Sequence, residues 1–173
     1  MKKKWYAIYT KQYCERKASL LLSKKNIINY LPLNRVIKEL ASQKNRHTLE
    51  PLFPNMLFVN IESSQFETIQ KTEEVINFFY WLGRKAIIND NEIMDIQRFI
   101  HDYSNIKIEK APVSLNRMLG INNIDNHKES IYIKNNRVTT ILKTIGYSIS
   151  AEVNISASDI VKYEINIKEM NIN

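Results

Sequence analysis

The sequence predicts an α+β fold, in which an antiparallel sheet with helices on one face is followed by a small β-rich module. Three observations predict it. Strand and helix patterns follow the order β, α, β, β, α, β, β, α through about residue 103. The next stretch is polar and contains Pro112 and Gly120, and only strand patterns return after residue 130. Apart from an extra short strand and a closing helix, the first order is that of a ferredoxin-like domain.

The first helix is predicted by the spacing of its apolar and small residues. A β-rich, alternating stretch over residues 5–10 predicts the strand before it, and a short strand over 27–31, stopped by Pro32, follows it. The helix spans about residues 12–25. Its stripe lies at offsets of 0, 4, 7 and 8 residues, on one helical face, and consists of Cys14, Ala18, Leu21 and Leu22.

The stretch EPLFPNMLFVNI at residues 50–61 predicts a strand over 53–61 with large side chains on both faces. Side chains alternate between the two faces of a strand. Leu57 and Val59 are therefore expected to pack on the helices. Met56 and Phe58 point the other way, where they need either a partner or a second layer of the protein itself.

Two helices and two short strands complete the first domain, which we place at residues 1–103. Ser64 and Glu67 stand in capping-box register, which predicts a helix running to about residue 72. Residues 75–82 and 85–88 are predicted strands, joined at Gly83 and Arg84. A third helix, capped by Asn89 or Asp90, is predicted by apolar residues in 3, 4, 3 spacing: Ile93, Ile96, Ile100 and Tyr103, with Phe99 beside them.

Residues 104–117 are expected to form a linker, and residues 118–173 a small β-rich module. Asn135 and Asn136 suit a tight turn between its first two strands. A unit of about 50 residues has a thin core and would lean on the first domain. Four strands are predicted in it, over residues 131–133, 138–143, 147–153 and 161–167.

Charge is distributed unevenly along the chain. The formal net charge is +7, yet residues 1–50 hold 12 Lys or Arg against three Asp or Glu, whereas the rest of the chain is slightly acidic. A concentrated basic segment favours a polyanionic partner such as nucleic acid. A solvated basic face is the alternative.

The chain lacks the patterns expected of an enzyme, a metal site or a membrane span. Cys14 is the single cysteine, which excludes an internal disulfide and a cysteine-based zinc cluster, and it is expected to be a small core residue. The histidines are far apart in the sequence, and none has a second histidine or a cysteine at helical spacing; they are His47, His101 and His127. With three glycines there is no phosphate-binding loop. No run approaches the roughly 18 apolar residues of a membrane span. From these observations together, we expect a cytoplasmic, non-enzymatic protein without cofactors.

Four ordered blocks carry a resemblance to a known family. They are WYAIYTKQYCERK at 5–17, YLPL at 30–33, EPLFPNMLFV at 50–59 and VINFFYWLGRKAIINDNEI at 75–93. Together they resemble the amino-terminal domain of the NusG family, and more narrowly its specialised paralogues, the RfaH-like and Bacteroides capsular polysaccharide locus antiterminators. The resemblance implies a transcription elongation factor that rides on RNA polymerase and has no catalytic activity of its own.

In this family an apolar patch of the domain packs on the clamp helices of the largest polymerase subunit. By motif position, the matching residues here are Tyr9, Met56, Phe58 and Phe79. Aromatic and Met side chains are common interface anchors. The alternative is that some of the four belong to the core.

The polar segment over residues 33–49 corresponds to the family's hairpin, which lies near the non-template DNA strand. Its candidate phosphate contacts are Arg35, Lys38, Lys44, Arg46 and His47. A solvated hairpin with nonspecific charge is the alternative. The first helix is also basic and either borders the DNA channel or is solvated; the residues concerned are Arg16, Lys17, Lys24 and Lys25.

The resemblance is weaker in the second module. The family ends in a small SH3-like β-barrel with a glycine-containing KOW motif, and RVTTILKTIGYSISAEV at 137–153 resembles its later strands. The glycine-rich turn is nearly lost, with only Met118, Leu119 and Gly120 to represent it, so a degenerate barrel is expected. Family barrels contact a ribosomal protein or the termination factor Rho.

The favoured hypothesis is an antitermination factor, dedicated to one operon, that binds polymerase and suppresses pausing or termination. Two alternatives remain. One is a ferredoxin-like nucleic-acid-binding regulator that acts without polymerase. The other is an adaptor or antagonist without antitermination activity, which the eroded second module favours.

Overall fold

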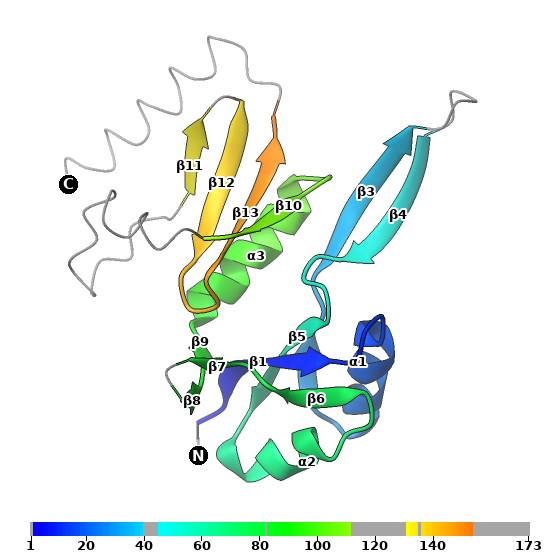
Figure 1. The fold of residues 1–173 in the computed structure, drawn as a ribbon, viewed down its shortest axis with the longest axis vertical. Coiled ribbons are helices and arrows are strands. Elements are labelled where there is room, and N and C mark those ends of the chain that lie inside the picture. The colour runs from blue at the N-terminus through cyan, green and yellow to red at the C-terminus, as the bar shows by residue number, and fades with distance from the viewer. Residues whose placement is uncertain (1, 40–44, 82, 112–130, 135, 154–173) are drawn as a thin grey trace, which may run out of the picture.

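The computed structural model describes residues 2–39, 45–81, 83–111, 131–134 and 136–153 (Figure 1). Within these ranges, short strands alternate with three α-helices as far as Asp102, and the described residues beyond it form strands and turns. The elements are β1 (Lys4–Thr10), α1 (Glu15–Lys24), β2 (Ile28–Tyr30), β3 (Leu33–Glu39), β4 (Asn45–Pro51), β5 (Met56–Ile61), a 3-10 turn (Ser63–Gln65), α2 (Phe66–Gln70), β6 (Val75–Phe78), β7 (Tyr80–Trp81), β8 (Arg84–Lys85), β9 (Ile87–Ile88), α3 (Asp90–Asp102), β10 (Lys107–Lys110), β11 (Ile131–Lys134), β12 (Arg137–Leu142) and β13 (Tyr147–Glu152).

The main sheet is antiparallel and has the order β2-β5-β1-β6, with β9 also paired to β1. In its centre, Ala7 of β1 lies opposite Phe58 of β5, and Tyr9 lies opposite Met56. Strands β6 and β9 share the free edge of β1, β6 at its end and β9 at its start. Four residues of β1 are therefore paired on both sides: Trp5, Tyr6, Ile8 and Tyr9.

One face of this sheet packs on α1 and α2. Leu57 and Val59 of β5 are fully buried there, as the sequence predicts, together with Ala18 and Leu22 of α1 and Ile69 of α2. These side chains form a core separate from the one on the other face. The first two helices thus cover one face only.

The opposite face of the sheet is covered by α3, and the expectation that all helices lie on one face is wrong. Ala7, Met56 and Phe58 belong to a second core with three residues of α3, Ile93, Ile96 and Phe99. Strand β5 is apolar on both faces, so a single layer of helices leaves half of it exposed to water. Placing α3 on the other side buries that half.

The starts of α3 and α2 are set by capping residues. The cap of α3 is the predicted one, and the cap before α2 is not. Asn89 caps α3, because its side-chain oxygen accepts a hydrogen bond from the backbone N–H of Asn91 at 3.0 Å. At α2 the expected box of Ser64 and Glu67 is replaced by Glu62 and Gln65, two residues earlier. The extra residues form the 3-10 turn.

The second module is a four-stranded antiparallel sheet of order β10-β13-β12-β11. Lys134 pairs with Arg137, so β11 and β12 are joined at Asn135 and Asn136 as predicted. Strand β10 lies inside the segment expected to be a linker and pairs with β13. These four described strands do not show the expected barrel. The predicted strand over 161–167 and the turn residues Met118, Leu119 and Gly120 lie outside the described residues.

The two modules pack against each other through α3 (Figure 1). The backbone N–H of Thr144, in the turn between β12 and β13, donates a hydrogen bond to the Glu92 carboxylate of α3 at 2.8 Å. Alternate residues of β12 and β13 join the core that contains Met56 and Phe58: Val138, Leu142, Ile149 and Ala151. One apolar core therefore spans both modules.

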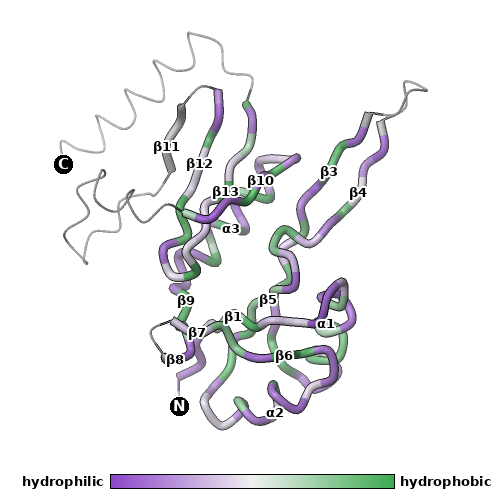
Figure 2. The backbone as a smooth tube through the Cα atoms, viewed as in Figure 1, coloured by the Kyte–Doolittle hydropathy of each residue, from purple (hydrophilic) through white to green (hydrophobic). Residues whose placement is uncertain are grey.

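Strands β3 and β4 form a ribbon that projects from the main sheet (Figure 1). Hydrophilic and hydrophobic segments alternate along it (Figure 2). In the part of the chain that the structure describes, no helix is long and apolar enough to cross a membrane.

Candidate interaction surfaces

The structure brings together the four residues that the sequence proposes as an apolar docking patch. Tyr9 lies opposite Met56 in the sheet, and its ring centre is 5.9 Å from that of Phe79. Phe58 lies two residues beyond Met56 and therefore on the same side of β5. We call this patch, formed by Tyr9, Met56, Phe58 and Phe79, the apolar face.

The apolar face is covered by the protein's own chain. Met56 is 2% exposed and Phe58 0%, while Tyr9 and Phe79 are half-buried. The Phe53 ring packs edge-on against Phe58 at 5.6 Å and lies 6.2 Å from the ring of Tyr147 in β13. From the sequence, Met56 and Phe58 are expected to need either a partner or a second layer of the protein itself. In this arrangement a second layer of the protein buries both residues.

The pKa values of two tyrosine hydroxyls are raised because this region excludes water. Burial raises the pKa of Tyr30, whose ring stacks on Phe58 at 6.3 Å, to about 12. Burial also raises the pKa of Tyr9, and the neighbouring Tyr147 raises it further. A buried phenol resists ionisation because the phenolate loses its hydration. Tyr147 was not among the sequence-predicted residues, because its contact with this face depends on how the modules pack.

The basic candidates of the β3–β4 ribbon divide between its two sides. Lys38 lies directly opposite Arg46, whereas His47 lies opposite Ile37, one position along. Because side chains alternate, Lys38 and Arg46 share one side, and Arg35 and His47 share the other. Lys44 lies outside the described residues. The structure thus does not gather the predicted phosphate contacts on one surface.

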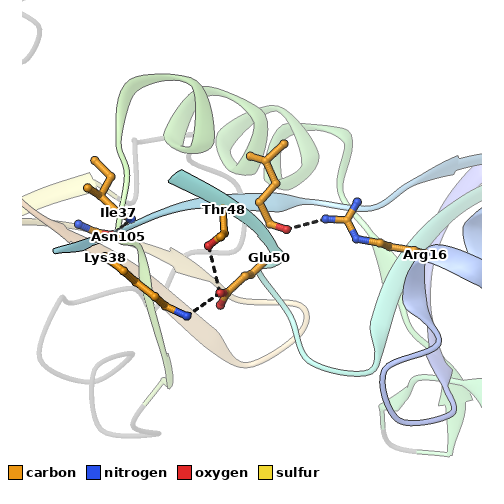
Figure 3. Close-up of polar contacts among 7 residues, drawn as sticks. Arg16, Ile37, Lys38, Thr48, Glu50 and Asn105 are labelled. Carbon is orange, nitrogen blue, oxygen red and sulfur yellow. Dashed lines mark hydrogen bonds and ion pairs between the residues drawn. The ribbon is translucent and has the colours of Figure 1, made fainter. Parts of the chain in front are cut away.

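One of these bases is already engaged within the ribbon (Figure 3). Lys38 donates to the Glu50 carboxylate at 3.0 Å, and Thr48 donates to the same oxygen at 3.2 Å. The bond from Lys38 lowers the pKa of Glu50, and Thr48 contributes in the same direction. Arg46 is exposed and forms no ion pair with the residues that the structure describes.

The base of the ribbon is held by the segment that follows α3. Asn34 is buried, and its side chain donates to the carbonyl of Ile106 at 2.9 Å and accepts from the N–H of Ile106 at 3.1 Å. Asn105 accepts from the N–H of Ile37 at 2.7 Å and donates its own N–H to the carbonyl of Arg35 at 2.8 Å. Sequence reasoning missed both asparagines. The positive φ of Asn105, 52°, suits Asn after a helix, but an isolated Asn is a weak signal.

The basic residues of α1 are mostly engaged inside the protein. Arg16 donates to the carbonyl of Leu49 in the ribbon (Figure 3), and Lys25 donates to the Thr72 hydroxyl at 2.8 Å. Lys17 bonds to Glu74, a carboxylate that Lys11 also contacts at 3.3 Å. These partners favour a structural role for three of the four predicted bases.

Glu74 is the most perturbed carboxylate among the described residues. The hydrogen bond from Lys17, followed by those from Lys11 and Cys14, lowers the pKa of Glu74 to about 2 despite its burial. Cys14 is only half-buried and stands at the N-cap of α1, so it is not the core residue that the sequence predicts. Burial and the bond to Glu74 raise the pKa of the Cys14 thiol.

No cluster of metal-binding side chains occurs within the described ranges. His47 lies on the ribbon and His101 near the end of α3, both exposed. His127 lies outside the described residues.

Comparisons with known proteins agree with this architecture. A family model described as transcription termination factor nusG matches residues 3–97, more than half of the chain. A search of curated proteins found no match. Among solved structures, one titled "Domain interaction in Thermotoga maritima NusG" is similar over 92% of this chain and 96% of that chain, with a TM-score of 0.50 and 16% identity. That similarity concerns the fold. The family match, the apolar face and the projecting ribbon together lead to one conclusion: the chain belongs to the NusG family of transcription factors, which regulate elongation and termination.

Proposed function

We propose that this protein is an antitermination factor, dedicated to one operon, that docks on RNA polymerase through the apolar face. The observation that carries the proposal is the convergence of Tyr9, Met56, Phe58 and Phe79 on one side of the main sheet. Aromatic and Met side chains in a contiguous patch are suited to grip the apolar side of a helix. The proposed receptor is the pair of clamp helices of the largest polymerase subunit.

The cover over the apolar face has a consequence for docking. A side chain that is 0% exposed, such as Phe58, cannot contact a partner until the layer above it moves. Docking therefore includes displacement of the second module, whose Tyr147 lies beside Phe53. Polymerase must supply the free energy that opens the inter-module core.

The β3–β4 ribbon is the proposed contact with the non-template DNA strand. Arg35 and Arg46 are its best-placed arginines, because both are exposed and form no ion pair among the described residues. Lys38 can contact a phosphate only after its hydrogen bond to the Glu50 carboxylate breaks. A few phosphate contacts of this kind hold single-stranded DNA without reading its sequence.

A capture experiment on polymerase from the native host tests the docking surface. Truncating Phe58 removes a fully buried ring, which costs about 3–5 kcal/mol of stability, so the half-buried Tyr9 and Phe79 are better probes. We expect Tyr9→Ala and Phe79→Ala to reduce capture at least tenfold. Leu20→Ala, at an exposed apolar residue of α1, is the control and should bind as wild type does.

A fourth variant tests whether the second module must move. Tyr147→Ala weakens the packing between the modules and should increase capture. If Tyr9→Ala and Phe79→Ala bind as tightly as wild type while circular dichroism shows both to be folded, the docking surface is wrong. Separate capture of a ribosomal protein and of Rho by the Tyr147→Ala variant tests these two as partners of the displaced second module.

Transcription through a terminator in the native leader separates the possible activities. An antitermination factor increases readthrough and shortens pauses. Increased termination would instead contradict the antitermination proposal. Charge changes on the ribbon could alter expression of the operon while variants that lose polymerase binding leave it unchanged. In that case the protein is a nucleic-acid-binding regulator that acts without polymerase, and the antitermination proposal is wrong.

A further inference from the structure

A second basic surface lies where the chain begins, beside the β7–β8 hairpin. Strand β9 pairs Ile88 with Trp5 of β1, and β8 precedes β9 by one residue. Trp81 of β7 is directly opposite Arg84 of β8. Figure 1 shows the amino terminus, β7, β8 and β9 together at one end of the molecule, away from the β3–β4 ribbon. We call this region the N-terminal corner: residues 2–5, 80–81 and 84–90, with Thr144.

A pocket of about 370 Å³ occupies the N-terminal corner. Its walls combine three kinds of group: ammonium groups, an aromatic ring with apolar neighbours, and a polar rim. It is lined by Lys2, Lys3, Lys4, Trp5, Ile87, Ile88, Asn89, Asp90 and Thr144. A volume of this size admits about one nucleotide.

The lysines of the corner are not used by the fold. Lys2, Lys3 and Lys4 are exposed, and no ion pair among the described residues engages them or Arg84. Lys11, Lys17 and Lys38 elsewhere in the first domain are all paired with carboxylates. The pocket therefore holds three lysines against one carboxylate, that of Asp90, and Arg84 adds a further positive charge on the neighbouring hairpin. This excess of positive charge favours a polyanion.

The corner also presents aromatic surface to solvent. Trp81 is 56% exposed and Tyr80 43%, which is unusual for large rings in a chain with a well-formed core. The hairpin that carries them is held in place, because the Lys85 ammonium lies 4.7 Å from the Phe66 ring centre and 5.6 Å from that of Tyr80. Fixed exposed rings beside free cations are the combination that binds single-stranded nucleic acid, by base stacking and phosphate contact.

One carboxylate in the pocket favours RNA over DNA. Asn89 already accepts from the N–H of Asn91, and Thr144 donates its N–H to Glu92. Asp90, in contrast, lines the pocket without an ion-pair partner among the described residues. An ionised carboxylate only accepts hydrogen bonds, so it repels phosphate but binds a hydroxyl donor, and the ribose 2′-hydroxyl is the donor that DNA lacks.

We propose that the N-terminal corner binds single-stranded RNA, with Lys2, Lys3, Lys4 and Arg84 on phosphates, Trp81 and Trp5 against bases, and Asp90 on a ribose hydroxyl. This site shares no residue with the apolar face or the β3–β4 ribbon, although Trp5 packs against the core that contains Met56 and Phe58. RNA binding at this site requires no polymerase, so the experiment that tests it is independent of the docking proposal.

The tryptophans make the site directly observable. The chain contains two, Trp5 and Trp81, and both lie in the N-terminal corner. Titration of the full chain with a ten-nucleotide adenosine RNA should quench tryptophan fluorescence through base stacking. Binding at the β3–β4 ribbon, which contains no tryptophan, would change the anisotropy of a labelled RNA without this quenching.

Two triple-lysine variants test whether the lysines of the N-terminal corner contact the RNA phosphates. The triple substitution Lys2→Gln, Lys3→Gln, Lys4→Gln should weaken RNA binding at least tenfold at about 0.1 M salt and reduce the slope of log affinity against log salt by about 2. The control changes the same net charge at three exposed lysines outside the corner, Lys24→Gln, Lys71→Gln, Lys110→Gln, and should alter affinity less than threefold. Trp81→Leu should lose most of the quenching.

The DNA counterpart of the oligonucleotide tests the role of Asp90. Wild type should bind the RNA at least fivefold more tightly than the DNA, and Asp90→Asn should remove this difference. Equal affinity of wild type for RNA and DNA would overturn the RNA assignment. RNA binding without tryptophan quenching, or equal losses in the corner and control triple variants, would overturn the site itself.

Discussion

Asn34 and Ile106 lie 72 residues apart in sequence, yet they exchange two hydrogen bonds as neighbouring strands do. The amide of Asn34 takes the place of a backbone peptide, donating to the carbonyl of Ile106 and accepting from its N–H. Ile106 stands one residue before β10, which pairs with β13 of the second module. The base of the β3–β4 ribbon and the start of the second module are therefore fixed to the same short segment.

Removal of this amide pair should loosen the base of the ribbon. Asn34→Ala leaves the buried N–H and carbonyl of Ile106 unpaired, which should lower the free energy of unfolding by about 1–3 kcal/mol in urea denaturation. The control is Asn77→Ala, because Asn77 is exposed and its side chain, among the described residues, accepts a hydrogen bond from the next backbone N–H alone. A loss no larger than that of the control would show that water replaces the pair without cost.

The Glu74 cluster should make stability depend on acid. Its pKa, about 2, lies below the ordinary value of 4.5, so the folded state favours the ionised form. The contribution of Glu74 to stability is therefore complete above about pH 4.5 and is lost as the pH falls toward 2. Glu74→Gln should flatten the fall in urea midpoint between pH 5 and pH 2.5. Glu67→Gln removes an exposed pair with Lys71 and should leave that slope nearly unchanged.

The two cores should respond separately to truncation. Leu22 belongs to the core under α1 and α2, and Ile149 to the core shared with the second module, and both are 0% exposed. Each truncation to Ala should cost about 2–5 kcal/mol. Hydrogen exchange should rise mainly in β10, β12 and β13 for Ile149→Ala, and mainly in α1 and β5 for Leu22→Ala. Uniform acceleration in both variants would mean that the modules unfold as one unit.

On the ribbon, Arg46 should contribute more to DNA binding than Lys38 does. Lys38 is held by Glu50, so a phosphate must first replace that carboxylate, whereas Arg46 is exposed. Arg46→Gln should lower the slope of log affinity against log salt for single-stranded DNA by about 0.7, the value of one phosphate contact. Lys38→Gln should change it by less. Equal slopes for the two variants would contradict a role for the Glu50 pair.

The order of residues was enough to predict the local elements and the two sides of β5. Apolar spacing located α1 and α3, Asn89 marked the start of α3, and alternation placed Leu57 and Val59 on the helices with Met56 and Phe58 opposite. These features depend on residues close together in the chain, where periodicity and capping act directly.

What lies above Met56 and Phe58 depends on how distant segments of the chain pack together. The pattern required a cover but did not distinguish a partner from the protein's own second layer, because the free energy of burial is the same for either. Likewise, alternation placed Lys38 and Arg46 on one side of the ribbon, but the bond to Glu50 and the anchor at Asn34 depend on contacts between distant segments. The physical reason is common to both: side-chain type sets how much surface must be buried or paired, and chain topology sets with what.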